Sequence, residues 1–274
     1  MVNGKAGLSY EGKRVVVAGG GGTGMGAAAV RLLGELGAEV VVLDLREPQL
    51  AGVEFHRTDL GDPEAIDAAV ALVGGPVDAL LNCQGISGAA PGTAASDVMR
   101  VNFLGVRHLT EAILPTMPPG AAVASISSAG GLGWSRRLEE IQELLETAEF
   151  DDGLRWCEDH ADGLLAPVFP KAYSFSKQAL IVWTMRRAVT AIDVGVRVNC
   201  SSPGSTETAM ASDFPEEGVQ YMNRPIGRGS NPEEQGWPVV FLASGAASYI
   251  NGANLIVDGG NAAARTLGLL ATSV

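Results

Sequence analysis

Short runs rich in β-branched residues recur along this chain of 274 residues, and longer segments rich in alanine and leucine separate them. The runs are apolar on both faces, whereas the separating segments have helical periodicity. Strands of this kind belong in a parallel sheet that helices cover on both sides. The pattern predicts an α/β fold with a doubly wound parallel sheet. The seven predicted strands lie in RVVVAGG, EVVVLDL, VEFHRTDL, VDALLNCQG, AAVASISS, VRVNCSSPG and ANLIVDGG.

A glycine-rich turn, GGGGTGMG, follows the first predicted strand and leads directly into a helix-compatible segment. Without Cβ atoms, Gly20, Gly24 and Gly26 permit a tight turn, close approach of the backbone to a pyrophosphate, and close packing of the helix on the strand. The free N–H groups and the positive dipole end of the helix would bind the phosphates. A flexible turn is the plain alternative, but the strand–turn–helix context favours a Rossmann-type dinucleotide site.

Asp44 ends the second predicted strand, about 20 residues after the glycine-rich turn. A carboxylate in this place binds the ribose hydroxyls of a dinucleotide and repels a 2′-phosphate. It therefore predicts NAD rather than NADP as the cofactor. The alternatives are a solvated carboxylate at a strand end and, because Arg46 follows two residues later, some tolerance of NADP.

The composition excludes several classes of partner. A net charge of −12 argues against nucleic acid and against an anionic membrane surface, because both require clustered lysine and arginine. The N-terminus lacks the apolar core of a signal peptide, and no apolar run approaches the ~20 residues that span a bilayer, so a cytoplasmic protein is expected. The three histidines (His56, His108 and His160) and the three cysteines (Cys83, Cys157 and Cys200) lack metal-ligand spacing, and no metal is expected.

One segment, residues 136–165, interrupts the alternation of strands and helices. It contains ten acidic and three basic residues, which gives it −7 of the net charge of −12. Because the chain has no low-complexity linker and no internal repeat, we expect residues 1–274 to form a single dinucleotide-binding catalytic domain. Residues 136–165 are expected to form an acidic helical insertion within it.

The order of several short motifs resembles the short-chain dehydrogenase/reductase family from about residue 12 to about residue 260. The G-x-x-x-G-x-G of 20–26 and the Tyr-x-x-x-Lys of 173–177 are joined by TDL at 58–60, NCQG at 82–85, VNFLG, ISS, SSPGSTET and NGANLIVDGG. Two positions depart from the family pattern. Gly19 replaces the usual Thr, which removes a hydroxyl that commonly braces the loop, and Cys83-Gln84 replaces Asn-Ala.

The resemblance implies a catalytic tetrad of Asn102, Ser128, Tyr173 and Lys177. Tyr173 would exchange a proton with the substrate oxygen, Ser128 would hydrogen-bond that oxygen, and Asn102 would help to position a water that links Lys177 to solvent. Lys177 would hold the nicotinamide ribose. Because Lys177 lies one helical turn from Tyr173, it would also favour the ionised phenol. Ser127 is the rival to Ser128, since a slip of one residue exchanges the faces of a strand.

The resemblance also implies a set of residues that bind the cofactor. Thr208 would bind the carboxamide of the nicotinamide, although an ordinary polar turn over Pro203–Thr208 is the plain alternative. The predicted cofactor residues are Gly20, Thr23, Gly24, Met25, Gly26, Asp44, Asp59, Leu60, Asn82, Gly85, Tyr173, Lys177, Pro203, Thr206 and Thr208.

The segment between Ser128 and Tyr173 has 44 residues and is longer than the corresponding segment in most members of the family. In this respect the chain resembles a subgroup that contains bacterial 3α-hydroxysteroid dehydrogenase/carbonyl reductases and coniferyl alcohol dehydrogenases. The subgroup implies a bulky, largely apolar secondary alcohol or ketone, of the steroid, terpenoid or aryl-alkyl class. A redox-sensing NAD-binding regulator remains an alternative, as does an enoyl reductase or epimerase on the same fold. The tight Tyr-x-x-x-Lys spacing disfavours the enoyl reductase.

The insertion has a specific expected role. Apolar residues at 138, 141, 144, 145 and 148 have helical spacing, so one helix face should pack on the body of the protein. The later apolar residues Leu164, Pro167, Val168 and Phe169 are expected to wall the substrate pocket. The alternative is an acidic helix that is merely solvated. By resemblance to the subgroup, the insertion would cover a helical surface used for dimer contacts, which favours a homodimer over a homotetramer.

Overall fold

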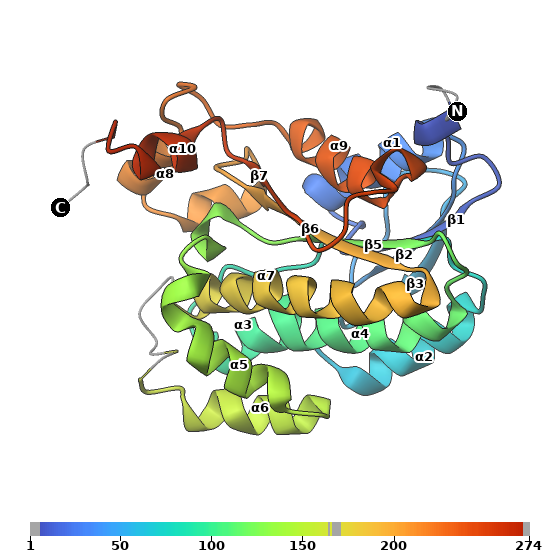
Figure 1. Ribbon diagram of the computed structural model, residues 1–274, viewed down its shortest axis with the longest axis horizontal. Coiled ribbons are helices and arrows are strands. Elements are labelled where there is room, and N and C mark those ends of the chain that lie inside the picture. Colours follow the sequence, from blue (N-terminus) through green and yellow to red (C-terminus); the bar gives the residue numbers. More distant parts are fainter. Residues whose placement is uncertain (1–5, 164, 166–170, 271–274) are drawn as a thin grey trace.

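The computed structural model describes residues 6–163, 165 and 171–270. Within them, seven strands form one parallel sheet in the order β3-β2-β1-β4-β5-β6-β7 (Figure 1), which confirms the predicted doubly wound fold. All seven predicted runs contain a strand. The strands are β1 Arg14–Ala18, β2 Glu39–Asp44, β3 Glu54–Arg57, β4 Ala79–Asn82, β5 Ala122–Ile126, β6 Arg197–Pro203 and β7 Asn254–Val257.

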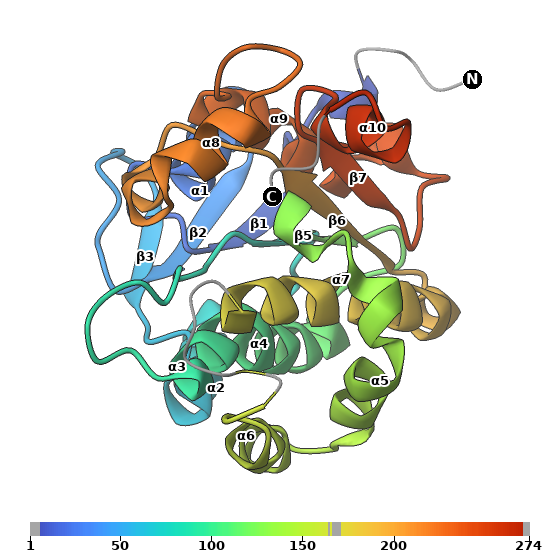
Figure 2. The same cartoon turned by 90° about the vertical axis from the view of Figure 1, so that its left-hand side faces the viewer.

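Helices cover both faces of the sheet, as Figures 1 and 2 show. Val15 and Val17 of β1 pack with α1 and α9 on one face, whereas Val16 packs with α2, α4 and α7 on the other. Successive side chains of a strand alternate between faces, so two buried faces require a continuous apolar run. These helices are α1 Met25–Glu35, α2 Pro63–Val73, α4 Gly105–Ile113, α7 Lys171–Ala191 and α9 Pro232–Ala243.

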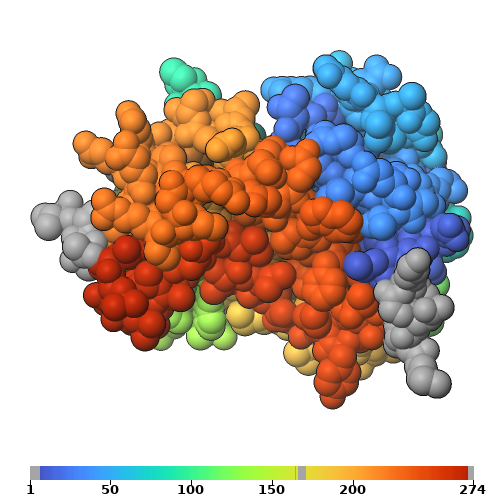
Figure 3. Space-filling view, turned by 90° about the horizontal axis from the view of Figure 1, so that it is seen from above, coloured from blue at the N-terminus to red at the C-terminus, as the bar shows by residue number. Residues whose placement is uncertain are grey.

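The C-terminal third of the chain returns to the N-terminal third. In the space-filling view from above, orange and red C-terminal segments lie against blue N-terminal ones (Figure 3). The contact includes the Tyr10 hydroxyl, which donates a 2.7 Å hydrogen bond to the Val240 carbonyl. Two further helices, α8 Glu216–Met222 and α10 Asn261–Thr266, lie near the carboxyl ends of β6 and β7.

The insertion forms two helices rather than one. Helix α5 spans Leu138–Glu146 and helix α6 spans Phe150–Asp159, with Ala148 exposed between them. Arg107 of α4 fixes this link, because its guanidinium donates to the carbonyl oxygens of Thr147 and Glu149. The expectation that position 148 extends the buried face is therefore wrong, since the helix ends at Glu146.

The insertion adds a further layer outside α7 (Figure 1). Ile141 and Leu144 of α5 are buried against Phe175 and Leu180 of α7, in a cluster that also includes Phe103. Trp156 of α6 stacks on Phe175, with 5.8 Å between the ring centroids. The predicted packing of one apolar face on the body of the protein is confirmed for α5.

Candidate active site

A crevice for a dinucleotide is expected where the strand order reverses. The chain passes outward from β1 to β2 and β3, and then returns to place β4 on the other side of β1. Loops that follow β1 and β4 therefore diverge at the carboxyl ends of these strands, which is where doubly wound folds bind ligands. The glycine-rich turn follows β1, and the NCQG motif follows β4.

The glycine-rich turn is packed too tightly for side chains at several positions. A Cβ on Gly26 would lie 2.1 Å from the Gly19 oxygen, and a Cβ on Gly20 would lie 2.8 Å from Val30 Cγ2. Gly19 has φ of +82°, and a Cβ there would lie 2.5 Å from the Gln84 nitrogen. A threonine therefore does not fit at position 19 with this backbone. The turn is instead braced by the Gly19 N–H, which donates 2.9 Å to the Leu43 carbonyl.

The N-terminus of α1 fits a pyrophosphate. Its N-cap residue is Gly24, which provides no side-chain cap, so the first N–H groups of the helix are available to an anion. A Cβ on Gly24 would meet no atom nearer than Thr208 Cγ2, at 3.8 Å. This turn therefore leaves room beside the helix end, and Thr23 and Met25 flank it.

Asp44 holds the glycine-rich turn in place. One carboxylate oxygen accepts a 2.9 Å hydrogen bond from the Gly21 N–H, and the other accepts one of 2.9 Å from the Arg46 N–H. A carboxylate has about four acceptor positions, so both oxygens retain capacity for ribose hydroxyls. Sequence reasoning missed this bracing contact, because spacing alone does not bring residues 21 and 44 together.

Of the residues predicted to bind the adenine, Asp59 and Leu60, and of the NCQG motif that begins at Asn82, some are exposed and some are buried. Asp59 is exposed and accepts from the Gly61 N–H, whereas Leu60 is buried. Asn82 is turned into the interior, where its amide donates to Thr110 and Ser125. Its side chain thus braces β4 against α4 and β5, and its part in cofactor binding stays a prediction.

Asn102 lies in a π-helical turn, Arg100–Leu104, between α3 (Ala95–Met99) and α4. Turns of this kind are often found at functional sites. Its Oδ1 accepts from the Ile86 N–H at 2.8 Å, and its Nδ2 donates to the Ile86 carbonyl at 2.9 Å and to Ser176 at 3.2 Å. The amide therefore fastens the loop after β4 to α7. Both amide hydrogens are used in this way, so the side chain positions neighbouring groups.

The two serines that follow β5 have different environments. Ser127 is buried, and its hydroxyl donates a 2.9 Å hydrogen bond to the Lys177 carbonyl. Ser128 is partly exposed, accepts a 3.0 Å hydrogen bond from the Gly130 N–H and hydrogen-bonds Tyr173. Ser128 therefore has the geometry that the resemblance implies, and Ser127 supports α7.

Tyr173 and Lys177 lie on one face of α7, as their spacing predicts. Burial raises the pKa of Tyr173 above its ordinary value, and the hydrogen bond from Ser128 only partly opposes this. The Lys177 ammonium lies 5.8 Å from the centroid of the Tyr173 ring and donates 2.9 Å to the Ile126 carbonyl. Burial is therefore the larger of the two influences on the pKa of Tyr173.

Lys177 gives a prediction for stability against pH. Burial lowers its pKa from 10.5 to about 8 in the folded protein. Between these values the unfolded chain binds more protons, so stability rises as the pH rises from about 8 to 10.5. Across this pH window, the free energy of unfolding of the wild type should rise by on the order of 3 kcal/mol more than that of Lys177→Met. Urea unfolding of both proteins at successive pH values measures the difference, and parallel profiles would contradict the lowered pKa.

A cavity of about 350 Å³ opens beside Ser128 and Tyr173. The segment after β6 supplies much of its wall, including Phe214, whose ring lies edge-on to Tyr173 at 5.6 Å. This wall was missed, because the sequence shows only short helical turns there. Its apolar lining includes Met210, Ala211, Phe214, Pro215, Val219 and Met222, and the predicted residues Met25, Pro203, Thr206 and Thr208 also line it.

The described part of the insertion does not line this cavity. Its apolar side chains pack in the layer outside α7, and Leu165 is buried in the same cluster. Leu164, Pro167, Val168 and Phe169, which were expected to wall the pocket, lie outside the described residues. The pocket-wall prediction for these residues therefore stays a prediction, whereas the apolar side chains of α5 pack against α7.

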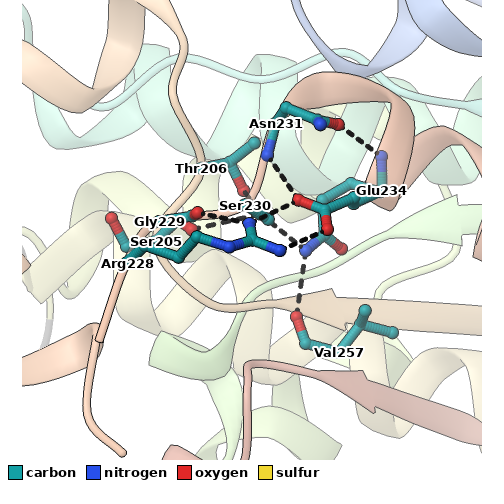
Figure 4. Close-up of polar contacts among 9 residues, drawn as sticks. Ser205, Thr206, Arg228, Gly229, Ser230, Asn231, Glu234 and Val257 are labelled. Atoms are coloured by element: carbon teal, nitrogen blue, oxygen red, sulfur yellow. Dashed lines mark hydrogen bonds and ion pairs between the residues drawn. The ribbon is translucent and has the colours of Figure 1, made fainter. Parts of the chain in front are cut away.

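A polar network anchors the segment that carries Thr206 and Thr208 (Figure 4). The Ser230 hydroxyl lies within hydrogen-bond distance of the Ser205 carbonyl and the Thr206 hydroxyl, each at 3.1 Å. Arg228 forms two 2.7 Å hydrogen bonds with the carboxylate of Glu234, at the start of α9. Since Thr206 lines the cavity, this network fixes one side of the site to α9.

The described residues contain no cluster of three or more His, Cys, Asp or Glu side chains arranged to hold a metal ion. The cysteines are free, and none of the described helices is long and apolar enough to cross a membrane. The crevice itself combines the turn after β1, which suits a pyrophosphate, with a serine, a tyrosine and a lysine beside an apolar cavity. This combination defines the class, a dinucleotide-dependent oxidoreductase.

Comparison with known proteins identifies the family. A family model described as "short chain dehydrogenase" matches residues 13–137, and one described as "Enoyl-(Acyl carrier protein) reductase" matches residues 164–262. The chain is 34% identical to coniferyl-alcohol dehydrogenase of Pseudomonas sp. (strain HR199 / DSM 7063), with coverage of 92% of this chain and 98% of the relative. The chain belongs to the short-chain dehydrogenase/reductase family. The two model matches leave out residues 138–163, which contain α5 and α6.

Two further comparisons agree. The chain is 31% identical to 3-alpha-hydroxysteroid dehydrogenase/carbonyl reductase of Comamonas testosteroni, over 90% of this chain and 95% of the relative. The structure resembles that of the 3-alpha-hydroxysteroid dehydrogenase from Pseudomonas sp. B-0831 complexed with NADH, with a TM-score of 0.74 and 28% identity. That match covers 96% of this chain and 100% of the other. The protein is an NAD(P)-dependent oxidoreductase of alcohols and ketones, which confirms the predicted enzyme class and disfavours a non-catalytic regulator.

Proposed function

We propose that this enzyme transfers a hydride between NAD and a bulky, largely apolar secondary alcohol or its ketone. The observation that carries the proposal is the cavity beside Ser128 and Tyr173, whose wall is mainly apolar. A cavity of about 350 Å³ falls in the size range of small-molecule sites. Steroid, terpenoid and aryl-alkyl skeletons match this lining, and the similarity to a coniferyl-alcohol dehydrogenase and a hydroxysteroid dehydrogenase supports the same classes.

Each residue of the Ser–Tyr–Lys group has a role that its geometry supports. Nicotinamide, when bound, supplies the hydride or accepts it. Tyr173 donates its proton to the oxygen of a ketone, and in the reverse direction its oxygen accepts the proton of the alcohol. Ser128 hydrogen-bonds the same substrate oxygen and stabilises the charge that develops on it.

Lys177 and Asn102 act beside these two residues. The lysine ammonium lies near Gly85, where a Cβ would be 3.5 Å from Nζ, at the crevice edge that would hold the nicotinamide ribose. Asn102 fixes the loop after β4, on the other side of Lys177, through Ile86. The α1 N-terminus would hold the pyrophosphate, and Asp44 the ribose of the adenosine half.

Cofactor choice tests the role of Asp44. We expect the wild type to prefer NAD over NADP by about tenfold or more in kcat/KM, because the carboxylate repels a 2′-phosphate; tenfold corresponds to about 1.4 kcal/mol. Asp44→Asn keeps the shape and one acceptor and should narrow the gap. Asp44→Ala should also narrow the gap between the two cofactors. It should lower kcat/KM with both of them, since the hydrogen bond to the Gly21 N–H is lost. Equal use of both cofactors by the wild type would refute the assignment.

The activity itself is tested by oxidation of secondary alcohols from the steroid, terpene and aryl-alkyl classes, followed as NADH formation at 340 nm. Small alcohols such as 2-propanol are the control, and we expect them to be much poorer substrates than bulky ones. An enoyl thioester assayed with NADH tests the alternative that the second family model suggests. Turnover of the enoyl thioester without turnover of any alcohol would overturn the proposal.

Assembly and location are part of the proposal. Helix α5 occupies the outer face of α7, so that face is closed to a second copy. Strand β7 lies at the edge of the sheet with Leu255 and Ile256 partly exposed, and edge strands readily pair. We expect a homodimer, and light scattering that gives a tetramer would contradict the proposed interface.

We also expect the protein to be cytoplasmic. Three free thiols agree with a reducing compartment.

A further inference from the structure

One arginine lies in the wall of the otherwise uncharged substrate cavity. Among the described residues that line the cavity, Arg265 is the one cationic side chain, and the rest are apolar, hydroxyl-bearing or glycine. It comes from the last turn of α10, far in sequence from the catalytic group. Neither the mechanism nor cofactor binding, as assigned above, uses this side chain.

Arg265 is carried by a helix that is fastened to the cavity wall. The buried Asn261 begins α10, and its amide donates to the carbonyl oxygens of Tyr221, at 2.8 Å, and Arg224, at 2.9 Å. The same segment, α8, provides Val219 and Met222 to the cavity. The helix start is also capped, because Asp258 accepts from the Gly260 and Ala262 N–H groups. The backbone of α10, from which the Arg265 side chain extends, is thus held at a defined place relative to the apolar wall.

The charge of Arg265 is uncompensated within the described part of the chain. Seven of the other fourteen arginines there pair with a carboxylate, among them Arg14, Arg31 and Arg228. No hydrogen bond or ion pair involves Arg265 among the described residues, although the chain carries 31 acidic residues. The side chain is exposed at the cavity wall, so its donors are accessible to an anion that enters the cavity.

We propose that Arg265 selects substrates that carry an anionic oxygen group at the end remote from the reacting carbon. The inference rests on the proposed function and narrows its substrate class to an alcohol or ketone with an apolar body and a carboxylate or similar anion. The hydroxyl would bind at Ser128 and Tyr173, and the body would lie against residues such as Phe214. The planar guanidinium pairs with a carboxylate through two parallel hydrogen bonds.

The test compares an acid with its neutral amide on the skeleton that the alcohol screen finds most active. For an aryl-alkyl skeleton, these are 1-(4-carboxyphenyl)ethanol and 1-(4-carbamoylphenyl)ethanol. The wild type should prefer the acid by about tenfold or more in kcat/KM, which corresponds to about 1.4 kcal/mol. Arg265→Met should abolish the preference while the dissociation constant for NADH stays within a few-fold. Arg265→Lys keeps the positive charge but loses the planar guanidinium, so it should retain part of the preference for the acid.

Arg224→Met is the matched control. It removes the same charge from the end of α8, close to α10, but Arg224 does not line the cavity. Its preference for the acid should equal that of the wild type. Raising the ionic strength from about 0.01 M to 0.15 M shortens the screening length from roughly 30 Å to 8 Å, and it should reduce the preference in the wild type but not in Arg265→Met.

The outcomes separate the two proposals. If neither compound nor any other secondary alcohol is oxidised, the proposed function fails and the inference fails with it. If the amide is oxidised as well as the acid, or if Arg265→Met keeps the preference, the inference alone is overturned. An equal loss of preference in Arg224→Met would assign the effect to general electrostatic attraction and would also overturn it.

Discussion

Replacing Tyr173 with phenylalanine should lower kcat/KM for alcohol oxidation by about 10²–10⁴-fold, the range that general acid–base catalysis supplies. The substitution removes the hydroxyl that exchanges a proton with the substrate, but it keeps the ring. The edge-on contact with Phe214, at 5.6 Å between centroids, should therefore persist and preserve the cavity wall. Steady-state kinetics and NADH titration measure the two effects, and the dissociation constant for NADH should change only a few-fold.

The matched control for Tyr173→Phe is Tyr249→Phe, because Tyr249 is fully exposed and lies outside the cavity. The control should retain wild-type kinetics. Residual activity above a few per cent in Tyr173→Phe would mean that another group transfers the proton. Loss of NADH binding would mean that the phenol holds the cofactor and that its assigned role is incomplete.

Leu144→Ala should destabilise the protein by about 2–5 kcal/mol, the cost typical of truncating a fully buried leucine. Leu144 of α5 is buried with Phe175 and Leu180 of α7, so the truncation leaves a cavity between the insertion and the catalytic helix. Urea unfolding monitored by tryptophan fluorescence gives the change. The KM values for a series of bulky and small alcohols should stay those of the wild type, because the described part of the insertion does not line the substrate cavity.

Glu143→Ala is the control for this prediction. Glu143 is exposed on the same helix, and surface substitutions of this kind usually change stability by less than about 0.5 kcal/mol. If Leu144→Ala raised KM selectively for bulky alcohols and left stability unchanged, the insertion would be a pocket element after all. Equal destabilisation by the two variants would show that α5 does not depend on its buried face.

Sequence reasoning succeeded where local pattern and chain order carry the information. The short runs rich in β-branched residues predicted every strand of the sheet. The signal is clearest in β1 and β2, where burial on both faces favours a continuous apolar run. The one-turn spacing of Tyr173 and Lys177 was enough to place both on one face of α7. It could not reveal that burial raises the pKa of Tyr173, because burial depends on the whole surrounding structure.

Long-range contacts were not accessible in this way. Asp44 accepts a hydrogen bond from the Gly21 N–H, and the Asn82 amide donates to a buried threonine. Ser127, rather than Ser128, donates to the Lys177 carbonyl. Each of these depends on which strands become neighbours. The cavity wall formed by residues 209–222 was likewise missed, because its short helical turns have too few residues to show helical periodicity. Its apolar side chains form a cavity wall only because the fold places them beside Tyr173.

The sequence by itself determined the parallel sheet, the glycine-rich turn and the order of the motifs, because these follow from periodicity and from backbone freedom within a few residues. Only the tertiary structure decided which segment walls the cavity, how the insertion packs, and that Arg265 meets the pocket of Ser128 from the other end of the chain. The physical reason is that side chains more than a hundred residues apart meet only after the sheet has assembled. Their burial, and with it their charge state and contacts, is a property of that assembly.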